Sequence, residues 1–183
     1  WPAESTALPE CHQPLLDLVA ELADAGRAVA RDLYGSGGWT CHHNTDLWRA
    51  TWPVGDGNDE PMWSHWPLPG AWLSLHLAEH WRYGRDADFL RERAWPVAAG
   101  AARFLLGILT EDASGHLVTG PATSPENRFS TAEGPASVDL STAMDLTLVR
   151  ELFGFLAESA GAAGAAADPR LLADIAAVLP RLR

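Results

Sequence analysis

The sequence predicts an all-α fold in which helical hairpins alternate with long loops. Three observations favour this class. Apolar residues recur at the helical period of 3.6 in several segments, strand signals are nearly absent, and long polar or proline-containing stretches separate the helices. Such hairpins can close into an all-α toroid whose loops meet at one end, so we expect functional residues in those loops.

Six segments carry the helical pattern. The first covers 12–34, with Pro14 suited to its first turn and a glycine-rich stretch at 35–38 ending it. The other expected helices cover 69–84, 86–93, 96–109, 138–158 and 168–182. Residues 117–119 predict a short extended segment, and the small residues at 161–167 predict a linker before the last helix.

Two loops interrupt the helical pattern. Residues 39–68 are polar and aromatic, and residues 119–129 contain two prolines, which disfavour a helix. A structureless loop of about 30 residues is unusual inside a compact domain, and such loops are usually functional. We therefore expect binding or catalysis there.

Composition excludes several classes of protein. The chain has 183 residues, a net charge of -11 and a hydrophobic share of 47%, which is too high for a disordered chain. The acidity argues against nucleic acid or an anionic membrane as the main partner, and no apolar run approaches the ~20 residues that span a bilayer. Two cysteines do not make a disulfide scaffold.

Composition also suggests an origin. All 13 basic residues are arginine and alanine is abundant, which is typical of a GC-rich bacterial genome. No secretory signal is visible in this chain, and the sequence leaves the location unknown, with a secreted or periplasmic one still open. The chain begins at Trp1 rather than Met, and we expect it to be cut from a longer protein.

Nine tryptophans, most of them between Trp39 and Trp95, allow two interpretations. They could fill a tryptophan-rich core. They could also line a cleft for oligosaccharides, because aromatic faces pack on the C–H faces of sugar rings and the indole N–H can bond hydroxyls.

The string His76-Leu-Ala-Glu79-His80 matches H-x-x-E-H. On a helix the two histidines share a face and could hold zinc, with Glu79 as the base. A further ligand would be needed, for which Glu151 or Glu158 could be nominated. We favour a structural or substrate-contacting pair, and expect neither a metal nor a cofactor.

The string Cys41-His42-His43-Asn44-Thr-Asp46 allows a thiol nucleophile assisted by a histidine, or a metal site. The alternative is a loop whose polar groups satisfy its own backbone.

The string Thr123-Ser-Pro-Glu126-Asn127 places one carboxyl group in a rigid loop. In an aromatic-lined cleft such a group loses hydration, which favours its protonated form. A general acid that protonates a glycosidic oxygen needs this property, although a turn-stabilising carboxylate is also possible.

Five strings in this order resemble glycoside hydrolase family 95, the α-L-fucosidases of 1,2-linked fucose with some α-L-galactosidases. They are Tyr34-Gly with Trp39–Trp48, Trp66–Leu73, His76–His80, Thr123–Asn127 and Met144–Phe153. The resemblance implies an (α/α)6-barrel catalytic domain flanked by β domains, and hydrolysis with inversion.

The resemblance also implies site residues. Glu126 would be the general acid, and an Asn-x-Asn pair that holds the attacking water would fall on Asn44 and, as a departure from the family pattern, on His42. The activating Asp is expected beyond Arg183, so we expect residues 1–183 to be the N-terminal portion of an incomplete barrel, whose partner is the remainder of its own domain. Candidates for sugar binding are His43, Trp66, Trp72, His80 and Asn127. The alternatives are an inactive carbohydrate-binding fragment and a zinc hydrolase.

Overall fold

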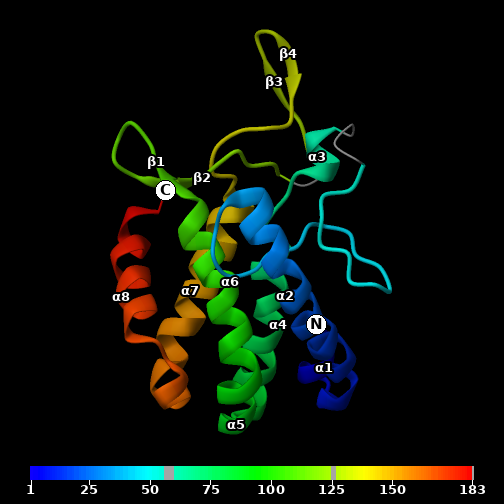
Figure 1. The fold of residues 1–183 in the computed structure, drawn as a ribbon, viewed down its shortest axis with the longest axis vertical. Helices are drawn as coiled ribbons and strands as arrows, with labels where there is room; N and C mark the ends of the chain where they lie inside the picture. The colour runs from blue at the N-terminus through cyan, green and yellow to red at the C-terminus, as the bar shows by residue number, and fades with distance from the viewer. Residues whose placement is uncertain (56–59, 125–126, 183) are drawn as a thin grey trace.

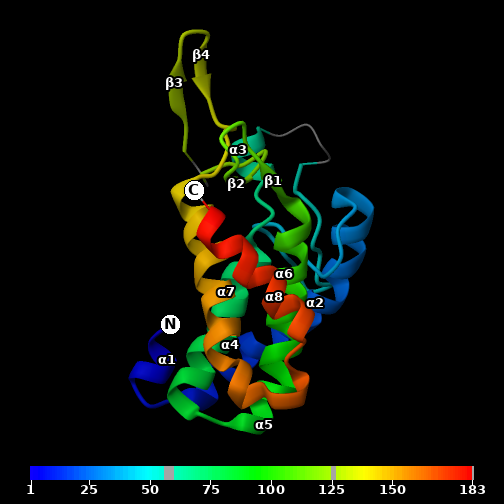
Figure 2. The ribbon, with the colours of Figure 1, turned by 90° about the vertical axis from the view of Figure 1, so that its left-hand side faces the viewer.

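The structure is a computed structural model that describes residues 1–55, 60–124 and 127–182. Its main helices form two layers (Figures 1 and 2). One layer holds α2 (Gln13–Tyr34), α6 (Trp95–Ile108) and α8 (Pro169–Val178), and the other holds α4 (Pro69–Gly84) and α7 (Ala143–Ala163). The chain thus alternates between the layers, and α6 packs against α2, α4, α7 and α8. The predicted mainly helical class is confirmed, and closure into a barrel stays a prediction.

Local chemistry accounts for the bounds of α2. Its apolar stripe of Leu16, Val19, Leu22 and Val29 is buried against the neighbouring helices. The helix ends at Gly35, whose φ of 62° is readily available only to glycine. The prediction for 12–34 is confirmed to within one residue.

Two predicted helices are one continuous helical segment in the structure. α5 (Ala87–Phe89) passes into a π-helical turn, η2 (Leu90–Ala94), which leads directly into α6. The break predicted before residue 96 was wrong. Pro96 follows the π turn at the start of α6, where the wider turn accommodates a residue that cannot donate a backbone hydrogen bond.

The helix predicted for 138–158 begins and ends later, as α7. Thr142 caps it by accepting a hydrogen bond from the Asp145 backbone N–H at 3.2 Å. The preceding residues are held outside the helix because Asp139 pairs with Ala122. The linker predicted for 161–167 was also wrong in part, since α7 continues to Ala163 before a 3-10 turn, η3 (Gly164–Ala166).

In the part of the chain that the structure describes, four short strands make two antiparallel hairpins at one end of the bundle. β1 (Leu109–Glu111) pairs with β2 (Leu117–Thr119), which confirms the extended segment, and β3 (Phe129–Thr131) pairs with β4 (Gly134–Ala136), which was not predicted. The short helix α3 (Pro61–Ser64) lies at the same end (Figure 1).

The remaining short elements lie elsewhere. α1 (Pro2–Ser5) and η1 (Pro9–Cys11) lead into α2 toward the opposite end, and η4 (Leu179–Arg181) follows α8. The helices of the described ranges fall short of what crossing a membrane requires.

The tryptophans divide into a buried group and an exposed group, and a sugar-binding role for the exposed ones stays a prediction. Trp39, Trp66, Trp81 and Trp95 are buried in the core. The other five are exposed: Trp1, Trp48, Trp52, Trp63 and Trp72.

Candidate active site at the loop end

Hydrogen bonds hold the two predicted functional loops together. The Thr123 hydroxyl donates to the His65 carbonyl at 2.6 Å, and His65 Nε2 donates to the Pro121 carbonyl at 3.2 Å. Arg128 reaches across to the Glu60 carboxylate at 2.7 Å. The segment 119–124 and Arg128 therefore lie against residues 60–66, although the two regions are about 60 positions apart in the chain.

Glu126, the expected general acid, lies outside the described residues. On either side of it, the Asn127 backbone N–H donates to the Ser124 carbonyl at 3.0 Å. The Asn127 side-chain oxygen accepts from the Arg128 backbone N–H at 2.9 Å. A small cavity of about 200 Å³ is lined by Ser124, Asn127, Arg128 and Asp139 among others. Asn127 is exposed to solvent there, as a sugar contact would have to be.

A buried carboxylate lies beneath the loops. Asp145 is fully buried and accepts hydrogen bonds from the Trp66 indole N–H at 3.2 Å and from the Thr119 hydroxyl at 3.0 Å. Burial raises the pKa of this carboxyl, opposed by the hydrogen bonds from Trp66, Thr119 and Thr142. Asp145 thus joins α7, β2 and the aromatic loop. This role was not predicted from the sequence, because Trp66 and Thr119 lie 79 and 26 positions away from Asp145 in the chain.

Trp66 and Trp72 lie together near the start of α4. Their ring centroids are 5.9 Å apart, and Trp72 is 40% exposed while Trp66 is buried. Of the two predicted sugar contacts, Trp72 therefore offers an accessible aromatic face, and Trp66 supports it from below.

His42 is held on both sides by protein groups. Its Nδ1 donates to the Thr51 carbonyl at 2.8 Å, so its Nε2 accepts the hydrogen bond from the Tyr34 hydroxyl at 2.6 Å. Burial, with smaller contributions from the nearby His65 and His43, lowers the pKa of His42 to about 4, against the raising effect of the Thr51 bond. A neutral ring with both nitrogens engaged fixes the loop, and in this arrangement neither nitrogen is left for a water or a sugar.

Asn44 and His43 are the accessible members of the same loop. Asn44 is exposed and His43 is half-buried. Asp46 accepts hydrogen bonds from the backbone N–H groups of Trp48 and Ala50, at 2.9 and 3.0 Å, so part of this loop does satisfy its own backbone. Burial raises the pKa of the Cys41 thiol to about 12, which argues against a thiolate nucleophile.

His80 does not join the loop-end residues. Its Nδ1 lies 2.6 Å from Glu4, a residue of α1, and its ring packs edge-on against Phe89 at 4.6 Å between centroids. α4 begins at the loop end and carries His80 toward its far end, beside α1 (Figure 1). The structure thus separates His80 from the other sugar contacts predicted above.

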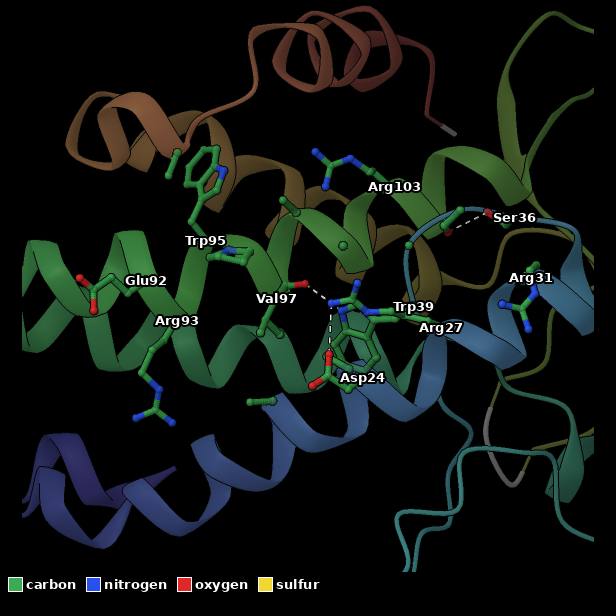
Figure 3. A pocket seen from close by; sticks show the side chains of 18 residues that line it. Asp24, Arg27, Arg31, Ser36, Trp39, Glu92, Arg93, Trp95, Val97 and Arg103 are labelled. Carbon is green, nitrogen blue, oxygen red and sulfur yellow. Dashed lines mark hydrogen bonds and ion pairs between the residues drawn. The ribbon is translucent and has the colours of Figure 1, made fainter.

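A larger cavity is a different feature. A groove of about 890 Å³ runs between α2 and α6 (Figure 3), where the Trp39 indole donates to the Val97 carbonyl at 2.8 Å and Arg27 pairs with Asp24. None of the site residues predicted from the sequence lines it. The candidate site is therefore assigned to the loop end, where Asn44, Trp72 and the segment around Glu126 supply suitable chemistry.

Comparison with known proteins finds the same family that the order of the sequence motifs indicated. The model of the glycosyl hydrolase family 95 catalytic domain matches residues 1–183. Alpha-L-fucosidase 2 of Arabidopsis thaliana is 36% identical over 97% of this chain, and probable alpha-fucosidase A of Aspergillus niger is 34% identical over 69% of it. The chain spans only 21% and 16% of the length of these relatives. The match along its whole length shows that this chain belongs to glycosyl hydrolase family 95.

Proposed function

We propose that the protein containing this chain hydrolyses terminal α-L-fucosides, with 1,2-linked fucose or an α-L-galactoside as the substrate and with inversion at the anomeric carbon. One observation carries the proposal: hydrogen bonds hold Pro121 and Thr123, which precede Glu126 in the chain, against His65, and the exposed aromatic Trp72 contacts Trp66 next to His65. The names of the two relatives, an alpha-L-fucosidase and a probable alpha-fucosidase, support the choice of sugar. The chain would form the N-terminal portion of an (α/α)6-barrel catalytic domain.

In this mechanism Glu126 protonates the leaving oxygen while a water attacks the opposite face of the sugar. Inversion needs the acid and the base about 6.5–9.5 Å apart, which leaves room for that water. Asn44, exposed in the neighbouring loop, meets the sugar or the attacking water. His43, Trp72 and Asn127 shape the pocket, and Trp66 supports it.

The arrangement gives His42 a positioning role. Its ring joins Tyr34 at the end of α2 to Thr51 across the loop, with Asn44 two residues away. The ring thereby fixes the backbone from which His43 and Asn44 project.

The direct test is Glu126→Gln in the complete protein. Loss of a general acid should lower kcat on 2'-fucosyllactose by roughly 10²–10⁴-fold while calorimetry still detects binding. Glu133→Gln is the matched control, because Glu133 is an exposed glutamate on the nearby β3–β4 hairpin. Unchanged turnover in Glu126→Gln would refute the assignment.

A second experiment tests the sugar and the stereochemistry. Aryl α-L-fucoside and aryl α-L-galactoside are compared as substrates, and proton NMR follows the anomer first released, which should be the β-anomer. Release of the α-anomer would contradict inversion. Sugar binding by the wild-type protein without any hydrolysis would favour a binding protein instead.

A further inference from the structure

Two histidines from separate segments of the chain lie against one oxygen of the Glu4 carboxylate. This cluster lies toward the end of α4 that is far from the loop end. Glu4 of α1 lies with its Oε1 2.7 Å from His12 Nδ1 and 2.6 Å from His80 Nδ1. His12 directly precedes α2, and His80 lies in α4. One donor atom from each of the three side chains lies within 4.8 Å of the other two. The H-x-x-E-H string lacked a further ligand in the sequence, and here Glu4 and His12 join His80 in place of Glu79 and His76.

The cluster is deeply buried. The side chains of Glu4 and His12 are each 3% exposed, and that of His80 is 19% exposed. The ion pairs recorded for Glu4 among the described residues are with these two histidines, whose charge depends on a proton. A buried carboxylate is costly unless a positive charge or metal accompanies it. A cation held between the three groups would supply that charge.

A further set of contacts orients His12. His12 Nε2 lies 2.9 Å from His76 Nδ1, and the Trp1 ring stacks on His76 with centroids 3.9 Å apart. Histidines that bind a metal through one nitrogen usually donate the other N–H to an acceptor that fixes the ring. His76 is placed to be that acceptor, and Trp1 holds His76 in turn. The partial exposure of His80 leaves an opening for water as a fourth ligand.

We propose that Glu4, His12 and His80 form a divalent-metal site, and that zinc is the ion it suits. Two imidazoles and one carboxylate with an open position are a common zinc ligand set. Tetrahedral zinc with bonds of about 2.0–2.1 Å sets its ligands about 3.3 Å apart. The hydrogen-bonded atoms must therefore move apart by less than about 1 Å, and each histidine must lose the Nδ1 proton when zinc binds. The bound ion would fasten α1 and the start of α2 to α4, away from the residues proposed for the glycosidase.

The test measures zinc binding to the metal-free protein. Equilibrium dialysis against Zn²⁺ should give one tight site per chain, and Co²⁺ in its place should give the visible absorption of tetrahedral cobalt. Glu4→Gln should weaken zinc binding by more than about 100-fold. His76→Phe, which keeps the stacking on Trp1 but removes the acceptor, should weaken it by about 10–100-fold.

Two controls separate this site from others. Glu10→Gln changes an exposed glutamate nearby, and Cys11→Ser removes the exposed thiol beside His12, so both should bind zinc as the wild type does. Circular dichroism verifies that Glu4→Gln folds, and His12→Gln repeats the test should it not. If the metal-free wild-type protein does not take up one zinc ion per chain in the dialysis, the proposal is overturned. Binding that Cys11→Ser abolishes, or that Glu4→Gln retains, overturns it as well.

Discussion

The state of His42 gives a quantitative prediction about acid stability. Its pKa falls from the ordinary 6.5 to about 4 because the ring is buried. The unfolded chain therefore binds a proton at this residue between those pH values while the folded protein does not. Stability must fall as the pH is lowered from about 6.5 towards 4. At about 1.4 kcal/mol per pKa unit, the loss reaches about 3 kcal/mol.

The assay compares urea unfolding of the wild type and of His42→Gln from pH 7 to pH 4. His76, whose pKa is also lowered by burial, is present in both proteins, so the difference between the two curves isolates His42. We expect the wild type to lose about 3 kcal/mol more than the variant over this range. Nitrogen-15 NMR of the imidazole should independently show a neutral ring protonated on Nδ1 at pH 6. Parallel stability curves, or a measured pKa near 6.5, would refute this account of His42.

Three further predictions concern the packing of the loops and helices, each measured as a change in the free energy of unfolding. Gly26→Ala should destabilise the protein by about 1–3 kcal/mol, because its new Cβ would lie 2.1 Å from the Thr40 carbonyl oxygen. Gly154→Ala is its control: nothing lies within 4 Å there, and alanine in this helix should stabilise by about 0.5–1 kcal/mol. Thr142→Ala should cost about 1 kcal/mol through loss of the α7 cap. Asp145→Asn should cost about 1–3 kcal/mol, because asparagine has an NH2 group in place of one of the two carboxylate oxygens that accept from Trp66 and Thr119. Unchanged stability of this variant would contradict the buried network.

Where local chemistry sets an element, the sequence alone predicted it. The N-cap Asp168 with Pro169 begins α8 as expected, and the glycine after Tyr34 ends α2. The order of the motifs likewise indicated the family. The predictions failed where the outcome depends on distant partners, as at the start of α7, which the pairing of Asp139 with Ala122 delays.

The arrangement of the side chains was decided by the tertiary structure. Asp145 meets Trp66 from 79 positions away, and Glu4 meets His80 from 76 positions away. Hydrophobic periodicity places a residue on a helix face, but it does not say which polar group of another helix lies opposite. The sequence thus determined the helices and the loops that carry the candidate chemistry. Only the packing of the helices and loops decided that both nitrogens of His42 are bonded within the protein and that His80 lies away from the loop end. The same packing brought the Glu4 carboxylate into contact with two histidines in the interior.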